Sequence, residues 1–381
     1  MNNEKIEPLK NNLKVVFDFQ IFLLQEYGGI SRYICNLAKK LSFLPAVQVR
    51  IFAPLHFNRN LQGLKEIPEF RCKIPFNNTK LFRPTRYISK FLSQKSIIKF
   101  KPDILHETYY SIENFATKGS KRVITVYDLI HERYPDLFER SHMTTEPKRL
   151  ALQRADHIIC ISESTRRDVI EMLGVKAEKT SVVYLGIDDN FLQPLEVNTK
   201  GTMHKRPYLL YVGARGGYKN FGNFLIAFTQ SERLKSDFDI ICFGGGSLNS
   251  NELVISKKLG LRAGQLSQIS GCDSVLFQLY KHAQALVYPS LYEGFGIPPL
   301  EAMVLGCPVI CSFSSSLPEV VGDAAEKFDP LDKDAITSSI ETVLYSPERR
   351  SILIKSGFER SKMFSWDKCA VETEIIYRKL A

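Results

Sequence analysis

Two glutamates, Glu293 and Glu301, lie eight positions apart on the string PSLYEGFGIPPLEAMVLGCPV. An apolar run, Ala285–Tyr288, precedes the string and predicts a buried strand. Two prolines fit the first turn of a helix, which a glycine then ends. We therefore expect Glu293 on the loop after the strand and Glu301 in the first helical turn. Carboxylates there accept hydrogen bonds from ligand hydroxyls, and the helix start suits a phosphate.

A second group of chemical side chains follows the apolar run Tyr208–Val212, which predicts another strand. Arg215 and Lys219 lie four positions apart across the glycine-rich loop Gly213–Gly217, and a helix is predicted over Phe221–Thr229. Two cations beside the free N–H groups of a helix start suit a diphosphate. Without further context, two exposed cations on an ordinary turn would give the same pattern.

The beginning of the chain repeats this arrangement. Leu13–Phe19 predicts a strand, Gly28 and Gly29 follow on a loop, and Ile30–Leu41 has the spacing of a helix. A strand, a glycine pair and a helix open a Rossmann-like unit, although glycine pairs also mark ordinary turns.

Composition limits the classes of protein that fit. The chain has 381 residues, 44% of them hydrophobic, which is enough for two domains. No apolar run approaches the roughly 18 residues that span a membrane, and the polar N-terminus has no signal core. The eight cysteines form no C-x-x-C pair, so we expect free thiols, a cytoplasmic location and no zinc site. The net charge of +10 favours anionic partners.

Residues 71–101 contain nine cations and no acid, interleaved with large apolar residues. This pattern is typical of a basic amphipathic helix that contacts an anionic membrane surface. It also fits a helix that buries its apolar face in the core and leaves its lysines in solvent. Nucleic acid is not expected to bind, because no nucleic-acid-binding signature accompanies the charge.

Strands and helices alternate in two series, separated by a polar stretch over residues 193–206 that we expect to be a linker. Such alternation predicts an α/β fold in which parallel sheets carry helices on both faces.

Several strings resemble one family. The string that begins at Glu293, EGFGIPPLE, closely resembles the E-G-F-G-x-P-x-x-E motif of retaining glycosyltransferases of family 4. The string that begins at Tyr211, YVGARGGYKN, matches the V-G-x-R-x-x-Y-K-N string of the same family. ADHIICISESTRRDV and VVYLGID resemble the end of their N-terminal domain. The resemblance covers almost the whole chain and is weakest over residues 57–101. It identifies the chain as similar to bacterial enzymes that build surface polysaccharides.

The resemblance implies the GT-B fold, in which two Rossmann-like, doubly wound parallel-sheet domains face a central cleft. Residues 1–195 would form the N-terminal acceptor domain and residues 196–363 the C-terminal nucleotide-sugar domain. Residues 364–381 would form a helix that crosses back onto the N-terminal domain.

The resemblance also implies an activity. A hexose would pass, with retention of configuration, from a nucleotide diphosphate sugar of the UDP-glucose or GDP-mannose type to a hydroxyl of a polysaccharide or polyprenyl-linked oligosaccharide. No DxD motif appears in the expected context, so metal independence and no cofactor are predicted. The enzyme would be cytoplasmic and peripheral on the inner face of the cell membrane. The nucleotide base, the sugar and the acceptor stay open.

Site residues follow by position. Glu293, Asp128, Arg215 and Lys219 would be catalytic, with Arg215 and Lys219 on the diphosphate. His106 and Tyr127 would face the acceptor, although Tyr127 stands where the family's T-V-H-D-L segment has its histidine. No metal ligand is expected. The donor-binding set would be Gly29, Arg215, Lys219, Ser270, Gly271, Cys272, Glu293, Gly294, Phe295, Gly296, Leu300 and Glu301.

Two other functions share these features. A nucleotide-sugar epimerase or hydrolase of the same fold would need an acid and a base at the site, which Tyr127 does not favour. A non-catalytic partner in polysaccharide assembly would keep a nucleotide pocket alone, whereas all four charged donor residues are present here.

Overall fold

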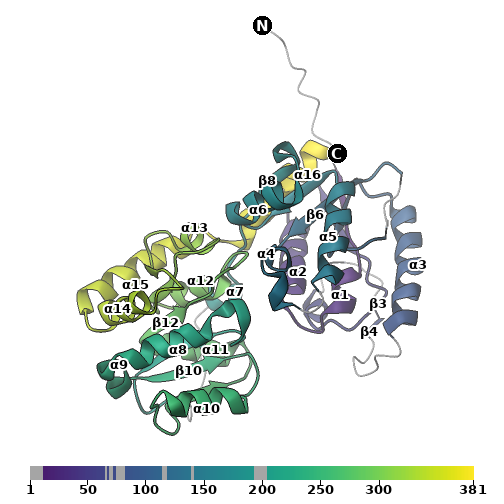
Figure 1. Cartoon of the computed structure of the whole chain (residues 1–381). Coiled ribbons are helices and arrows are strands. Elements are labelled where there is room, and N and C mark those ends of the chain that lie inside the picture. The colour runs from purple at the N-terminus through teal and green to yellow at the C-terminus, as the bar shows by residue number, and fades with distance from the viewer. Residues whose placement is uncertain are drawn as a thin grey trace. The chain divides into compact units, whose positions relative to one another are not determined.

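The computed structural model describes residues 12–64, 67, 72–73, 82–113, 118–138, 141–192 and 204–381. The chain divides into two compact units (Figure 1). Unit 1 comprises Met1–Gly186 and Trp366–Ala381, and unit 2 comprises Ile187–Ser365. The boundary expected after residue 195, and most of the expected linker, lie outside the described residues.

A six-stranded sheet forms the centre of unit 1, and all its pairings are parallel. The strand order is β2-β1-β5-β6-β7-β8. Because both faces of a parallel sheet are covered, its strands read as continuous apolar runs. The strands are β1 (Leu13–Phe17), β2 (Val47–Ile51), β5 (Ile104–Glu107), β6 (Lys121–Val126), β7 (His157–Cys160) and β8 (Thr180–Val182), with a separate pair β3 (Leu55–His56) and β4 (Cys72–Lys73).

Helices connect these strands. Their boundaries follow local chemistry: the helix after β7 begins where the Ser162 hydroxyl accepts a hydrogen bond from the Thr165 N–H at 3.0 Å, and it ends at Gly174 in the left-handed conformation. The helices are α1 (Gln20–Leu24), α2 (Gly29–Ser42), α3 (Phe82–Phe100), α4 (Ile130–Arg133), α5 (His142–Arg154), α6 (Glu163–Leu173) and α16 (Trp366–Leu380), with 3-10 turns η1 (Asn60–Gly63), η3 (Pro135–Leu137) and η4 (Ala177–Lys179).

Unit 2 has the same plan, with a parallel sheet in the order β11-β10-β9-β12-β13-β14. Its core packs the aromatic face of one helix, with Phe221, Phe224 and Phe228, against Tyr211 of the first strand. The strands are β9 (Tyr208–Val212), β10 (Asp239–Phe243), β11 (Leu266–Ile269), β12 (Ala285–Tyr288), β13 (Val309–Ser312) and β14 (Glu326–Phe328). The helices are α7 (Asp189–Leu192), η5 (Gly217–Lys219), α8 (Phe221–Gln230), α9 (Glu232–Asp237), α10 (Ser250–Lys258), α11 (Asp273–His282), α12 (Ile297–Val304), α13 (Leu317–Val321), α14 (Lys333–Leu344) and α15 (Pro347–Ser361).

Each sheet reverses its strand order once. The reversal lies between β1 and β5 in unit 1, and between β9 and β12 in unit 2. Adjacent loops leave such a switch point in opposite directions, which opens a crevice outside the carboxyl ends of the strands where ligands bind. The doubly wound α/β fold expected from the sequence is confirmed.

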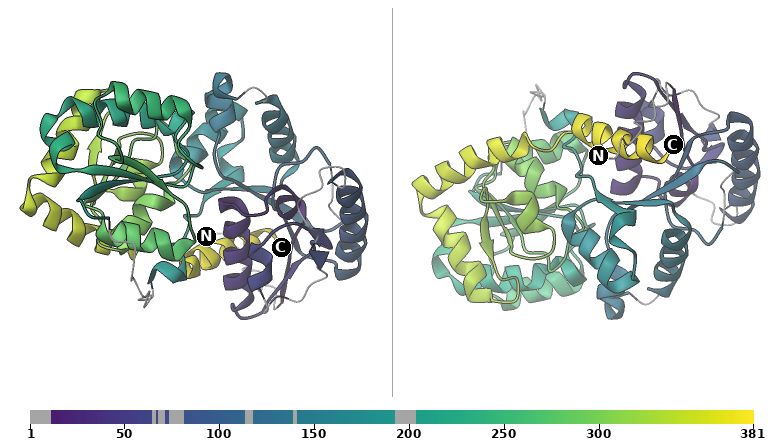
Figure 2. Two further views of the ribbon diagram at one scale, coloured as in Figure 1. Left: turned by 90° about the horizontal axis from the view of Figure 1, so that it is seen from below. Right: turned by 90° about the horizontal axis from the view of Figure 1, so that it is seen from above.

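The C-terminal helix α16 belongs to unit 1, where it lies beside α2 (Figure 2). The Lys40 ammonium and the Asp367 carboxylate are 3.0 Å apart. Deeper in the unit, the buried His106 ring bonds the Tyr377 hydroxyl through Nδ1 and the Thr125 hydroxyl, at 2.9 Å, through Nε2. This contact fixes α16 to the central sheet.

Helix α3 reverses the usual orientation of an amphipathic helix. Its buried side chains are Thr85, Ser89, Ser93 and Ile97. The Ser89 hydroxyl donates to the Leu55 carbonyl at 3.1 Å, and the Ser93 hydroxyl donates to the Phe52 carbonyl at 2.8 Å. Large apolar side chains lie outside instead, namely Tyr87, Ile88, Phe91 and Ile98. Because Ile97 is buried and Leu92 and Phe100 are half-buried, the described part of this helix places only some of its large apolar residues in the core.

The His106 contact predicts a pH dependence of stability. Burial lowers the pKa of His106 to about 3, whereas an unfolded histidine has a pKa near 6.5. Below pH 6.5 the unfolded chain therefore binds the extra proton, and the free energy of unfolding falls as the pH drops toward 3. We expect the wild type to lose about 1–2 kcal/mol more than His106→Gln between pH 6.5 and 5.

Urea unfolding followed by circular dichroism at pH 7, 6 and 5 measures this difference. All other titrating groups are common to both proteins, so the difference in slope isolates His106. Parallel curves for the two proteins would show that His106 is not held neutral by the fold.

Candidate functional site

The switch point of unit 2 brings two predicted residues together. Lys219 ends the loop that follows β9, and Glu293 lies on the loop that follows β12, the neighbouring strand. The Lys219 ammonium donates to Glu293 Oε1 at 2.6 Å and to the Tyr288 hydroxyl at 3.3 Å. Burial opposes the charge on Lys219, but Tyr288 and Glu293 favour it more strongly, so its pKa is raised well above the ordinary value. The Lys219 ammonium and the Glu293 side chain form an ion pair at this edge of the sheet.

Serines of the loop after β13 hold the Glu293 loop in place. The Ser315 hydroxyl accepts from the Glu293 N–H at 2.8 Å, and the Ser316 hydroxyl donates to the Glu293 and Phe295 carbonyls at 2.9 and 2.8 Å. Gly296 follows with a φ of +108°, and a Cβ there would lie 2.7 Å from the Leu317 side chain. Only glycine fits this position. The sequence analysis gave these serines no role, because their partners are backbone groups.

Asn220 fixes the loop that carries Lys219. It adopts the left-handed conformation, with a φ of +58°. Its side-chain amide donates to the Pro289 carbonyl at 3.0 Å and to the Pro330 carbonyl at 2.8 Å. The Lys219 and Glu293 loops are therefore joined by backbone-directed bonds as well as by their ion pair.

The Arg215 guanidinium turns toward the loop after β10. It donates to the Gly244 carbonyl at 3.1 Å and to the Gly246 and Ser247 carbonyls at 2.9 Å each, and its Nε donates to Glu252 at 2.8 Å. Its side chain is 3% exposed. In this conformation Arg215 braces the glycine loop at the end of β10. The structure therefore brings Arg215 to the expected edge of the sheet.

The sequence predicted Glu301 in the first turn of its helix, but the structure places it in the second turn. The reason is that α12 begins at Ile297 and already includes both prolines in its first turn. The Glu301 side chain is buried and accepts from the Tyr280 hydroxyl at 3.0 Å. Burial, followed by the Glu301 carboxylate, raises the pKa of Tyr280 well above its ordinary value, so the phenol stays protonated and donates.

The remaining predicted donor residues of unit 2 differ in exposure. Ser270, Gly271 and Cys272 are exposed between β11 and α11. Leu300 and Phe295 are buried, so they can offer a ligand backbone groups but not side chains. Gly294 is half-buried beside Glu293.

In unit 1, Asp128 follows β6 and is half-buried, and Gly29 is the exposed first residue of α2. The Asp128 loop rests on a buried ion pair that the sequence analysis missed. The Lys148 ammonium donates to Glu132 at 2.8 Å and to the Asp128 carbonyl at 2.9 Å, although Lys148 is only 1% exposed. Lys148 is an unremarkable member of a polar helix in the sequence, so no local pattern indicates its burial.

The two predicted acceptor residues are buried. Both ring nitrogens of His106 are bonded within the core, which contradicts an acceptor contact through its side chain. The reason is that β5 ends beneath α16, whose Tyr377 covers the ring. Tyr127 is 6% exposed and packs edge-on against Tyr33, with ring centroids 5.5 Å apart. Burial raises the pKa of Tyr127 well above its ordinary value, so it supplies no base near neutral pH.

Within the described part of the chain, no three His, Cys, Asp or Glu side chains gather in a way that could hold a metal ion. The charged groups of the unit 2 site are Lys219, Glu293 and the Arg215–Glu252 pair. Together they place a cation and a carboxylate in contact at the carboxyl edge of the sheet.

Comparison with known proteins agrees with this geometry. Residues 27–191 match the family described as Glycosyltransferase Family 4, and residues 194–360 match the Glycosyl transferases group 1 family. O-antigen chain mannosyltransferase B of Escherichia coli is 28% identical over 378 residues, which cover 92% of this chain and 96% of that protein.

Solved structures share the fold at low identity. Sucrose-phosphate synthase from Thermosynechococcus elongatus aligns with a TM-score of 0.75 at 19% identity, covering 97% of this chain and 99% of that chain. HepE from Anabaena, solved in complex with UDP and glucose, aligns with a TM-score of 0.71 at 17% identity, covering 97% of this chain and all of the other. With both units matched in sequence and in fold, the chain belongs to the family 4, group 1 glycosyltransferases and is a glycosyltransferase of the GT-B fold.

Proposed function

We propose that this glycosyltransferase moves a hexose, with retention of configuration and without a metal ion, from a nucleotide diphosphate sugar to a hydroxyl of a polysaccharide or lipid-linked oligosaccharide. The observation that supports the proposal most directly is the contact between Lys219 and Glu293 at the switch point of unit 2, with a distance of 2.6 Å. In a nucleotide diphosphate sugar, the cation would contact the diphosphate and the carboxylate would contact the sugar hydroxyls.

Lys219 has the charge that the leaving group needs. Cleavage of the sugar–phosphate bond leaves negative charge on the nucleoside diphosphate, and a preorganised ammonium stabilises that charge as it develops. The Tyr288 and Glu293 side chains keep Lys219 protonated, so the cation is present throughout the neutral pH range. On this view a protein cation does the work for which other transferases use a metal.

Glu293 has the charge that the sugar ring needs. As the bond to the diphosphate breaks, positive charge grows on the sugar ring, and a nearby carboxylate stabilises it while accepting hydrogen bonds from sugar hydroxyls. Glu301, whose carboxylate accepts from the Tyr280 hydroxyl, is proposed to bind the ribose. Since Tyr127 is a buried phenol, we propose that the leaving phosphate, and not a protein base, takes the acceptor proton.

Relatives support both donor types. The Escherichia coli relative is named a mannosyltransferase, and HepE was solved with UDP and glucose. We propose a donor of the GDP-mannose or UDP-glucose type, and a role in the assembly of a surface polysaccharide.

We also propose a cytoplasmic location with peripheral contact to an anionic membrane through the outer face of α3. Five cations and no acid occur in α3, and Tyr87, Phe91 and Ile98 are 74%, 54% and 55% exposed. Among the described helices, none has both the length and the apolar character to cross a bilayer. Seven cysteines of the described residues are free thiols, which suits a reducing compartment, namely Cys35, Cys160, Cys242, Cys272, Cys307, Cys311 and Cys369.

A donor assay tests the transferase proposal. Purified protein is incubated with GDP-mannose or UDP-glucose and a glycan acceptor, with EDTA and without it. Glycosyl transfer that survives EDTA supports the proposal, and nuclear magnetic resonance of the product reports the anomeric configuration. Free hexose alone would indicate a hydrolase, an epimerised donor would indicate an epimerase, and loss of transfer in EDTA would refute metal independence.

The same assay gives a sharp prediction for Glu293. We expect Glu293→Gln to lower turnover by about a hundred- to a thousandfold, because it removes the carboxylate while keeping the side-chain size. Nucleotide binding, measured as the thermal shift with UDP or GDP, should change little. Glu348→Gln, on the exposed first turn of α15, is the matched control and should behave as wild type. Equal turnover in both variants would remove Glu293 from the mechanism.

Arg215 and Glu252 separate two roles for the guanidinium. If Arg215 binds the diphosphate, Arg215→Ala should weaken nucleotide binding by about ten- to a hundredfold, since a hydrogen bond to a charged group is lost. Glu252→Gln weakens the competing ion pair and should leave affinity unchanged or raise it. Isothermal titration with UDP and GDP measures both. An equal loss in the two variants would instead show that Arg215 acts by bracing the loop after β10.

Vesicle flotation tests the membrane contact. We expect the protein to float with vesicles that contain anionic lipid at low salt, and not with zwitterionic vesicles or at high salt, because salt screens the attraction. Phe91→Asp should abolish flotation, while Phe43→Asp, an equally exposed phenylalanine of unit 1, should not. Absence of the wild type from the floated fraction would end this proposal.

A further inference from the structure

A cavity of about 530 Å³ opens in unit 1 outside the carboxyl ends of β1 and β5. This is the switch point of the sheet, where ligands of doubly wound folds bind. Its volume lies in the range of small-ligand pockets. None of the predicted catalytic, donor-binding or acceptor residues lines it, so its occupant has to be argued from its own chemistry.

A buried carboxylate fixes the walls of the cavity. Asp18, which follows β1, is fully buried and accepts hydrogen bonds from the Gln20 amide at 2.6 Å and from the Thr108 hydroxyl at 2.5 Å. The Thr108 hydroxyl also accepts from the Ile21 N–H at 3.1 Å. The loops after β1 and β5 are thereby tied together, and the cavity between their outer parts is preformed.

The interior of the cavity offers polar and aromatic groups. Gln20 and Tyr110 are each 8% exposed, and Tyr109 and Ser111 lie beside them. Aromatic faces with amide and hydroxyl groups are suited to a sugar ring, which has apolar faces and polar edges. Burial and then the Asp128 carboxylate raise the pKa of Tyr109 to about 12, so its hydroxyl stays protonated near neutral pH.

The mouth of the cavity has the opposite character. Leu24, Ile112 and Met143 line it and are 48%, 64% and 60% exposed. Large apolar side chains gathered at an opening are unfavourable in water and mark a surface that another apolar group covers. A free, soluble sugar would not cover them.

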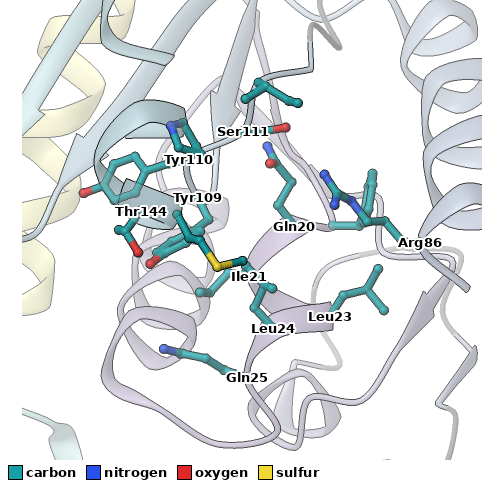
Figure 3. Close-up of a pocket in the computed structure, with 14 residues that line it drawn as sticks. Gln20, Ile21, Leu23, Leu24, Gln25, Arg86, Tyr109, Tyr110, Ser111 and Thr144 are labelled. Atoms are coloured by element: carbon teal, nitrogen blue, oxygen red, sulfur yellow. The ribbon is translucent and has the colours of Figure 1, made fainter. Parts of the chain in front are cut away.

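A cation lies at one side of the cavity. Arg86 lines the cavity from α3, on the side opposite Tyr109 and Tyr110, with Gln20 between them in this view (Figure 3). Its side chain is 46% exposed, and its Nη2 forms an ion pair with Glu113 Oε1 at 3.9 Å. The planar guanidinium of Arg86 is well suited to bind the oxygens of a phosphate. Beyond Arg86 lies the exposed apolar face of α3.

We propose that this cavity is an acceptor subsite for the sugar–phosphate junction of a lipid-linked glycan. The sugar ring lies against Tyr109 and Tyr110, the phosphate lies on Arg86, and the lipid chain leaves across the apolar mouth toward the outer face of α3. The inference rests on the proposed function, since it assigns the acceptor of that transfer. Polar groups inside and apolar groups at the rim are the arrangement that a sugar attached to a lipid requires.

Binding of mannose probes to the full chain tests the subsite by isothermal titration. The probes are farnesyl phosphoryl mannose and mannose 1-phosphate, so that only the lipid differs. Arg86→Glu should weaken binding of both probes by tenfold or more, because both contain the phosphate. Leu24→Asp should weaken the lipid-linked probe by a similar factor and leave mannose 1-phosphate unchanged.

Matched variants exclude general effects of charge and polarity. Lys99→Glu, on the same helix, and Leu137→Asp, an equally exposed leucine of unit 1, should bind both probes as the wild type does. Losses as large in these controls would overturn the subsite and point to a diffuse surface effect. Unchanged probe binding in Arg86→Glu would overturn it too, and loss of vesicle flotation alone in that variant would assign Arg86 to membrane contact only.

The donor assay distinguishes failure of this inference from failure of the proposed function. If the wild type transfers hexose to a lipid-free glycan but binds neither mannose probe, the subsite is wrong and the transferase proposal stands. If no nucleotide sugar is turned over by the wild type, the proposed function fails first.

Discussion

Helices cover both faces of a parallel sheet, so polar side chains cannot gather there without disturbing the core. They gather instead on the loops at the carboxyl edge of the sheet. Both units of this chain obey that constraint, and each reverses its strand order once. In unit 2 the reversal brings Lys219 against Glu293, and in unit 1 it ties the loops after β1 and β5 through the buried Asp18. The chemistry of each unit therefore follows from its strand order.

The Lys219–Glu293 pair of unit 2 shows how neighbouring side chains keep a buried ammonium charged. Lys219 is close to two tyrosine rings, with its ammonium 5.1 Å from the Tyr218 centroid and 5.4 Å from that of Tyr288. Rings and carboxylate together outweigh the cost of burial and keep the ammonium charged. Asn220 and the serines after β13 hold the two loops through backbone bonds, and so fix the positions of both members of the pair. Preorganisation of this kind is what makes a fixed charge useful in catalysis.

The sequence predicted the central strands well, because a strand buried on both faces is a continuous apolar run, and Tyr208–Val212 and Ala285–Tyr288 were predicted to the residue. It missed β14, an edge strand of three residues, and α10, which has no apolar stripe. Among the site residues, loop positions followed from motif and spacing. His106 did not, since its partner Tyr377 is 271 positions away and no local pattern reports such a contact. Lys148 was missed for the same reason.

The structure differs most from the prediction made from the sequence at helix α3. Its sequence has enough large apolar residues to form a core face, yet the fold buries two serines whose hydroxyls satisfy the Leu55 and Phe52 carbonyls. Burying a large apolar side chain stabilises a fold by about 1.5–3 kcal/mol, so the outward Tyr87, Phe91 and Ile98 represent stabilisation that the isolated unit does not obtain. This exposed apolar surface lies next to a cavity with a polar interior. It is explained if these apolar side chains are buried in the lipid of a membrane. The outward face of α3 and the mouth of the cavity then form one continuous lipid-facing surface, with Arg86 at the boundary between lipid and sugar.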